Sequence, residues 1–120
     1  MESMKKNYVG IVGSRGFSIA RRDEAKRYIA TLPRGTVVVT GDCPTGVDLT
    51  VRDEARHRGL VVVQCMAPWD IGHSAGDMRN QVIADISKMV LGIWDGNSPG
   101  TANALAHGKA FGKPIEIRKA

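Results

Sequence analysis

The chain has 120 residues, of which 42% are hydrophobic and 24% are charged, and its formal net charge is +5. This length allows one hydrophobic core but not two, so we expect a single globular domain over residues 1–120, with residues 1–6 as a flexible tail. The basic charge suits an acidic partner, but the lysines and arginines are scattered over several segments without interleaved aromatic residues, so we expect no nucleic-acid partner.

Cysteine usage and the N-terminal segment indicate the compartment. Cys43 and Cys65 are too few and too far apart for a disulfide scaffold or a zinc or redox motif, which favours a reducing environment. Residues 1–6 are charged and contain no apolar signal-peptide core, and no apolar stretch is long enough to cross a bilayer. We therefore expect a cytoplasmic protein with no membrane partner.

Five apolar runs alternate with four helical patterns along the chain. The runs cover residues 8–12, 36–39, 60–63, 89–93 and 115–117. The middle runs are continuous, which is typical of strands covered on both faces. The last run alternates apolar and charged residues, which predicts a strand at the edge of the sheet.

Apolar residues recur at helical spacing between these runs. The four stripes are Ala25, Tyr28, Ile29 and Leu32; Val47, Val51 and Ala55; Met78, Val82, Ile83 and Ile86; and Ala102, Leu105, Ala106 and Ala110. Gly35, Gly59 and Gly112 follow three of the helical patterns, where a left-handed C-terminal cap is expected. The apolar residues of the last two helical segments could also form the contact face of a homodimer.

This order of elements predicts an α/β protein with a three-layer Rossmann-like fold. Short right-handed crossovers give a mostly parallel five-stranded sheet with helices on both faces. In such a sheet the loops that follow the strands meet at one edge, where ligands of open α/β folds bind.

The loop after the first run contains Gly13, Ser14 and Arg15, which offer a tight turn, a hydroxyl group and a guanidinium suited to phosphate. An ordinary turn with a solvent-facing arginine is the alternative. Gly10, Gly13 and Gly16 do not have the spacing of a dinucleotide-binding GxGxxG motif.

The loop after the second run contains Gly41 and Asp42, and Asp48 is expected in the first turn of the next helix. Asp48 could accept hydrogen bonds from a ribose or a base, or it could serve only the helix dipole. Asp42 is a weaker candidate for the same role.

The third loop is longer and carries Trp69, which could stack on a nucleobase or cap the core. The helix after it opens near Ser74 and contains Arg79 and Asn80. We expect Arg79 to flank the sheet, so its guanidinium needs a counter-charge. Asp42, Asp48 or Asp95 could supply it, or a ligand phosphate.

The fourth loop, residues 95–101, is the best candidate for a phosphate site. Gly100 and Thr101 stand between a strand pattern and a helical pattern, so their backbone N–H groups would point at an anion. Gly100 would allow close approach of a ligand, and Thr101 adds a hydroxyl group.

Other site types are disfavoured. His57, His73 and His107 have no metal-ligand spacing, so we expect no metal and no other cofactor. There is no Gly-x-Ser-x-Gly motif and no Walker lysine, which argues against serine hydrolases and P-loop NTPases.

Several of these motifs together resemble the SLOG superfamily, the Rossmann-like group that includes the LOG cytokinin-activating hydrolases and the DNA-processing protein DprA. The motifs are Gly-Ser-Arg at 13–15, the segment 41–48, Trp69, Ala-Gly-x-x-Arg-Asn at 75–80 and the turn at 95–101. The resemblance spans essentially the whole chain and is greatest to the small single-domain YspA-like proteins of bacteria and phages.

The resemblance implies a pocket for a nucleotide or nucleotide-derived ligand. Its implied lining is Ser14, Arg15, Gly41, Asp48, Arg79, Asn80, Gly100 and Thr101. LOG enzymes also carry a glutamate three residues after the threonine of the Gly-Thr turn, and this chain has Ala104 there. The carboxylate that would serve N-glycosidic cleavage is therefore missing.

We accordingly expect a ligand-binding or sensing module rather than an enzyme. An N-glycoside or phosphoribosyl hydrolase is one alternative and would require Asp48, Asp42 or Asp95 as a catalytic carboxylate. A DprA-like DNA-binding protein is another and would require a continuous basic surface.

Overall fold

The structure is a computed structural model that describes residues 7–72 and 74–120. The expected flexible tail, residues 1–6, lies outside the described residues, as does His73. In chain order the elements are β1 (Tyr8–Gly13), α2 (Ile19–Ala30), β2 (Val37–Thr40), α3 (Gly46–His57), β3 (Val61–Gln64), the 3-10 helix η1 (Trp69–Ile71), α4 (Ala75–Ile86), β4 (Met89–Trp94), α5 (Pro99–Ala110) and β5 (Ile115–Lys119). Each apolar run forms the expected strand, with ends that differ by at most two residues.

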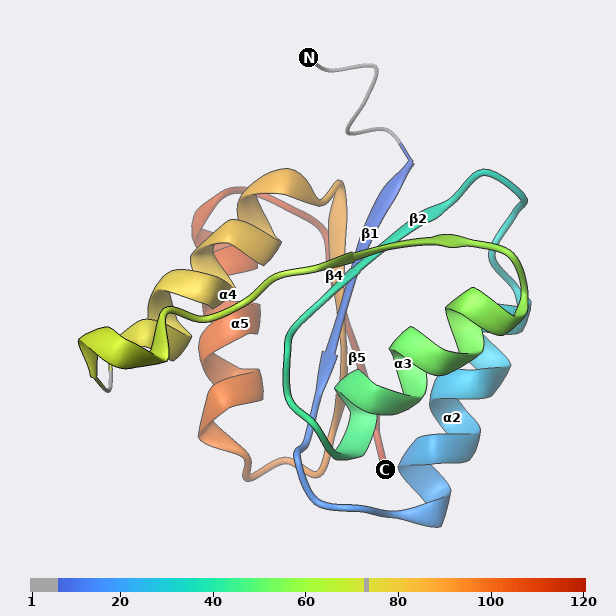
Figure 1. The fold of residues 1–120 in the computed structure, drawn as a ribbon, viewed down its shortest axis with the longest axis horizontal. Helices are drawn as coiled ribbons and strands as arrows, with labels where there is room; N and C mark the ends of the chain where they lie inside the picture. The colour runs from blue at the N-terminus through green and yellow to red at the C-terminus, as the bar shows by residue number, and fades with distance from the viewer. Residues whose placement is uncertain (1–6, 73) are drawn as a thin grey trace.

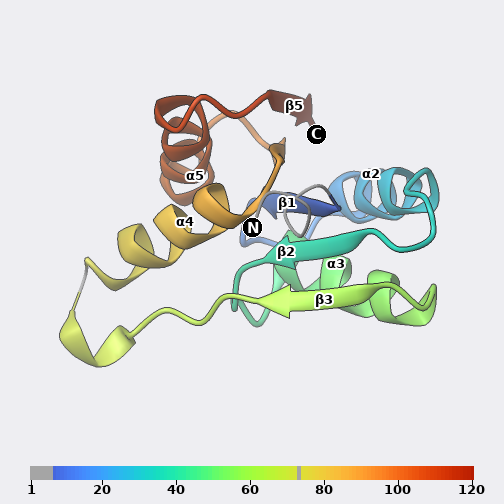
Figure 2. The same cartoon turned by 90° about the horizontal axis from the view of Figure 1, so that it is seen from above.

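The strands form one five-stranded sheet in the order β3-β2-β1-β4-β5. All four pairings are parallel. Helices α2 and α3 lie on one side of the sheet and α4 and α5 on the other, as Figures 1 and 2 show. The predicted three-layer Rossmann-like α/β fold is confirmed, and β5 lies at an edge as expected. Among the described residues, no helix is both long and apolar enough to cross a membrane.

Strand β3 differs from the prediction. The continuous apolar run at 60–63 indicated a strand covered on both faces, but β3 is the second edge strand and Val61 is 62% exposed. Helix α3 packs against β3, whereas α4 contacts β1 on the opposite side of the sheet. One face of β3 is therefore partly exposed to solvent. The prediction that this strand is covered on both faces was wrong.

Two buried clusters form the core, one on each side of the sheet. Val9 and Ile11 of β1 point into the cluster that includes Ile29 of α2, and Val12 points into the cluster that includes Ile83 of α4 and Leu105 of α5. Successive strand residues alternate between faces, so one apolar strand can serve both clusters. Each fully buried Val, Leu or Ile contributes roughly 1.5–3 kcal/mol.

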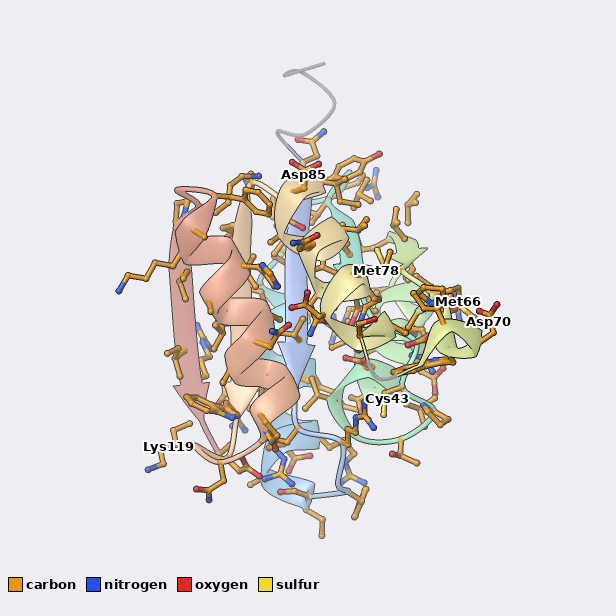
Figure 3. The ribbon with its side chains drawn as sticks, turned by 90° about the vertical axis from the view of Figure 1, so that its left-hand side faces the viewer. Cys43, Met66, Asp70, Met78, Asp85 and Lys119 are labelled. Atoms are coloured by element: carbon orange, nitrogen blue, oxygen red, sulfur yellow. The ribbon has the colours of Figure 1, made fainter. Side chains whose placement is uncertain are left out.

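The buried face of α4 matches the predicted apolar stripe only in part: Ile83 is buried and Ile86 packs against the core. Met78 and Val82 are 46% and 49% exposed, while Arg79 and Asn80 are 8% and 5% exposed. Figure 3 shows Met78 on the side of α4 that faces the loop carrying Met66. The prediction was wrong for Met78 and Val82, because polar side chains with partners at the sheet edge take the buried positions near the start of α4. A pattern of apolar residues alone does not detect this.

Helix α5 also has a buried face that differs in part from its predicted stripe. Leu105 is buried as expected, but Ala106 and Ala110 are exposed. Ala104 and Gly108 are buried in their place. Small residues thus face the sheet and allow close packing. The expected caps are confirmed for Gly59 and Gly112, which follow the last residues of α3 and α5 with φ angles of 76° and 74°. Gly35 has a φ angle of 92°, but α2 is capped earlier, at Thr31, and Gly35 lies in the turn before β2.

Gly13 is predicted to be required for packing of α3 against the end of β1. A Cβ atom there would lie 2.5 Å from the carbonyl oxygen of Ile93 and 2.5 Å from Val47 Cβ, so the backbone would have to move. We expect Gly13→Ala to lower the free energy of unfolding by about 1–3 kcal/mol in thermal or urea denaturation. Gly100→Ala is the matched control, since a Cβ there meets nothing within 4 Å. Equal stability of the two variants would contradict this packing.

Candidate functional site

A cavity of about 410 Å³ opens at the edge of the sheet where the strands end. In Figure 1 this is the end at which the arrowhead of β1 lies and α5 begins. Eight of the ten residues expected to bind ligand line it: Gly13, Arg15, Gly41, Asp48, Arg79, Asn80, Gly100 and Thr101. The loops after β1, β2 and β4 and the second turn of α4 therefore converge on one space.

Trp69 lies beside this main cavity rather than in it. It lines a second cavity of about 280 Å³ together with Asp42 and Pro44. Arg15 and Arg79 line both cavities, and each guanidinium carbon is 5.9 Å from the centre of the Trp69 ring. The indole is 51% exposed, so it does not cap the core.

Ser14 is the one expected ligand residue that lines neither of these cavities. It is 1% exposed, and its hydroxyl oxygen accepts a hydrogen bond from the Asp95 N–H at 3.2 Å. Its carbonyl oxygen accepts from the Val47 N–H at 3.1 Å. Ser14 thus ties the β1 loop to the β4 loop and to the start of α3.

The first turn of α5, which lines the main cavity, leaves backbone donors without partners. Ser98 is the N-cap and Pro99, the next residue, has no N–H group, so Gly100 and Thr101 carry the next two amides. Among the described residues, none accepts a hydrogen bond from either N–H group. Two free amides at the positive end of a helix favour an anion there.

Asp95 shapes the turn that precedes α5. Its Oδ1 accepts hydrogen bonds from the N–H groups of Asn97 and Ser98, both at 2.8 Å. These bonds, followed by those from the hydroxyl groups of Ser98 and Ser14, lower the pKa of Asp95 to about 2. The carboxylate is thereby engaged in the turn, and Asp95 does not line the main cavity.

The counter-charge of Arg79 is Asp42. The Arg79 guanidinium donates to Asp42 Oδ1, and the two side chains are 8% and 4% exposed. Asp42 Oδ2 accepts from Ala67 N–H and from Trp69 Nε1, both at 3.0 Å. Burial alone raises the pKa of Asp42, but these two hydrogen bonds and the charge of Arg79 together hold it below its ordinary value.

Asp48 is buried in the wall of the main cavity, in the first turn of α3. Its carboxylate accepts hydrogen bonds from the Thr40 hydroxyl at 3.2 Å and the Cys43 N–H at 3.3 Å. Burial raises the pKa of Asp48, although Arg79 and these hydrogen bonds oppose the shift. A Cβ at Gly41 would lie 2.6 Å from Asp48 Oδ2 and 2.7 Å from Arg79 Nη1, so a larger residue would force these two side chains to move.

Two residues of this region were missed by sequence reasoning. Arg52 was counted among the scattered surface charges, but it is buried and donates to the Gly41 carbonyl oxygen at 3.0 Å. Arg52 follows Asp48 by four residues on the same helix, and this spacing could have predicted that the two side chains share one face. Cys43 lines both cavities and lies at about the height of the β1 arrowhead in Figure 3; a lone cysteine in a loop gave no such signal.

Residues 7–72 and 74–120 contain no cluster of three or more His, Cys, Asp or Glu side chains that could hold a metal ion.

These features define a Rossmann-like α/β fold. A solved structure of DNA processing protein A (DprA) from Streptococcus pneumoniae has this fold, with a TM-score of 0.80 and 16% sequence identity. The match covers 95% of this chain and 50% of that one, so the chain spans about half the length of that protein. No protein-family model and no curated protein matches the chain.

Asp48 and Asp95 are predicted to change stability with pH in opposite directions. The folded-state pKa of Asp95 is about 2, below the unfolded value of 3.8, so its stabilising contribution is lost as the pH falls through that range. The pKa of Asp48 is raised above 3.8, so its contribution is present below 3.8 and is lost as the pH rises through the folded-state value.

Urea denaturation across this pH range checks both signs. Asp95→Asn should reduce the loss of stability on acidification, and Asp48→Asn should reduce the loss as the pH rises. A profile unchanged from that of the unsubstituted protein in either variant would contradict the corresponding assignment.

Proposed function

We propose that this protein binds a nucleotide or nucleotide-derived phosphorylated ligand at the carboxyl edge of its sheet and acts as a binding or sensing module. The observation that carries this is the main cavity, where two arginines and two unpaired helix amides line one space. Its volume of about 410 Å³ lies within the range of small-molecule sites.

The phosphate would lie between the first turn of α5 and the guanidinium groups. Gly100 and Thr101 offer N–H donors, and Gly100 leaves open space in front of the backbone. Arg15 and Arg79 add charge-assisted hydrogen bonds, which are stronger than neutral ones. An anion here would meet positive charge from two directions, while Asp48 could accept from a ligand hydroxyl group.

The planar part of the ligand would lie in the second cavity against Trp69. The indole is half exposed and its Nε1 is already bonded to Asp42, so the ring is held in place while its surface stays open. A base that stacks on a rigid aromatic ring gains affinity without hydrogen bonds that recognise its identity. Because both cavities share the two arginines, one ligand could reach both.

Two other functions are weaker candidates. A nucleotide N-glycosidase or phosphoribohydrolase is favoured by Asp48, a cavity carboxylate with a raised pKa. Asp42 and Asp95 have their oxygens engaged in hydrogen bonds, and Ala104 is buried in the core. A DprA-like role on DNA is favoured by the shared fold alone.

We also propose membership of the YspA-like branch of the SLOG superfamily, a cytoplasmic location and a homodimer through α4 and α5. The branch is supported by the motifs at 13–15, 75–80 and 95–101, and the dimer by the exposed side chains of Met78 and Val82.

Arg15→Gln is predicted to weaken ligand binding by about 10- to 100-fold, because it removes a charge-assisted hydrogen bond. A thermal-shift screen of AMP, ADP-ribose, NAD and cyclic dinucleotides selects the ligand, and calorimetry measures its dissociation constant. Arg22→Gln is the control, since Arg22 lines neither of the two cavities.

Each alternative predicts a different result. A recovered ligand that is chemically intact supports the binding module. Release of free base, abolished by Asp48→Asn, would establish the hydrolase instead. Salt-sensitive retention of oligonucleotides without any small-molecule response would favour the role on DNA.

Trp69→Leu is predicted to remove discrimination between AMP and ribose 5-phosphate. Loss of stacking should weaken AMP binding by about 1–3 kcal/mol and leave ribose 5-phosphate binding unchanged. Trp69→Phe keeps an aromatic surface and should retain most of the AMP affinity. Equal losses for both ligands would place the base elsewhere.

A further inference from the structure

A chain of hydrogen bonds runs along the contact between α4 and α5, from the main cavity to the outer surface. At the cavity end, Arg79 Nε donates to Asn80 Oδ1 at 2.8 Å. Asn80 Nδ2 donates to Asn103 Oδ1 at 3.0 Å, and Asn103 Nδ2 donates to Asp77 Oδ1 at 2.9 Å. Asp77 Oδ1 also lies 2.7 Å from His107 Nε2.

The direction of this chain is set by its two ends. A guanidinium can only donate and an ionised carboxylate can only accept, so each amide between them has one orientation that satisfies both neighbours. Hydrogen bonds from Asn103 and then from His107 lower the pKa of Asp77, so the carboxylate stays ionised. The chain therefore has a fixed polarity from Arg79 outward.

Asn80 is the point where this chain meets the anion site. It is 5% exposed, and its Nδ2 also donates to the Gly100 carbonyl oxygen at 3.3 Å. One amide side chain thus holds the Arg79 guanidinium through its oxygen and the first turn of α5 through its nitrogen. The relative position of the two groups expected to bind one phosphate depends on this amide.

Asn103 and Asp77 line neither the main nor the second cavity, so a ligand there would not touch them. We infer that Asn103 and Asp77 are positioning residues of the anion site: they fix the amide of Asn80 and so align Arg79 with the free amides of α5. This inference rests on the proposed function and extends it to residues outside the cavities. Small misplacements of binding groups cost large factors in affinity, so an outer hydrogen bond can control the site.

An exchange of the two side chains tests this inference. Asn103→Asp alone puts a carboxylate oxygen where Nδ2 now lies 2.9 Å from Asp77 Oδ1, so two like charges face each other, and their repulsion displaces the oxygen that accepts from Asn80 Nδ2. The double variant with Asp77→Asn and Asn103→Asp restores an amide and a carboxylate in reversed order, so the repulsion is removed and the oxygen that accepts from Asn80 Nδ2 returns to its place. Asp85→Asn is the control, because Asp85 is an exposed acid near the opposite end of α4 in Figure 3.

Calorimetry with AMP and with inorganic phosphate is the binding readout. Asn103→Asp should weaken both by about 10-fold or more, as loss of an outer hydrogen-bonding partner does at metal sites. The double variant should bind within about twofold of the unsubstituted protein. Affinity that follows thermal stability in every variant, or a double variant as weak as the single one, would overturn the inference.

A second readout needs no ligand. In ¹⁵N–¹H spectra of the free protein, Asn103→Asp should shift the Arg79 Nε–H signal and the Gly100 and Thr101 amide signals, and the double variant should return them toward their original positions. Unchanged signals in Asn103→Asp would overturn the inference whatever the binding result. If these shifts occur but the unsubstituted protein binds neither AMP nor phosphate, the proposed function fails while the positioning by Asn103 and Asp77 stands.

Discussion

The carboxylate of Asp42 is the group on which the geometry of the candidate site depends. It pairs with the guanidinium of Arg79 on α4 and accepts hydrogen bonds from Ala67 and Trp69 in the preceding loop, so it joins the loop after β2 to both of these segments. Loss of one partner of a buried ion pair typically costs about 3–5 kcal/mol, because the other charge stays buried without compensation. The loop with its tryptophan and the helix with its arginine therefore keep one arrangement relative to β2.

This constraint explains how a polar face can turn toward a sheet. Arg79 and Asn80 take buried positions on α4 because each has partners at the carboxyl edge: Asp42 for the first, and Gly100 and Asn103 for the second. Asp48 balances part of the positive charge without closing the cavity. The result is an open space with surplus donors, which an incoming anion with acceptor oxygens would satisfy.

The fold was largely predictable from periodicity and glycine positions, because five apolar runs with helical stripes between them allow few topologies. The convergence of the loops after β1, β2 and β4 followed from that topology. The edge position of β3 did not, since valines favour strands wherever they lie in a sheet. The buried face of α4 and the burial of Arg52 were also missed, because a charged residue becomes buried only when a partner distant in the sequence is in place. The sequence left Asp42, Asp48, Asp95 and a ligand phosphate open as partners of Arg79, and only the fold could select Asp42.

Titration of ¹⁵N-labelled protein with AMP tests the central claim most directly, namely that separate loops form one cradle for a phosphorylated ligand. The account predicts saturable shifts of backbone amides confined to residues 13–16, 41–43 and 100–101, together with the Trp69 indole N–H. Shifts spread over the exposed arginines of α2 and α3, or no shifts with any nucleotide at millimolar concentration, would contradict it.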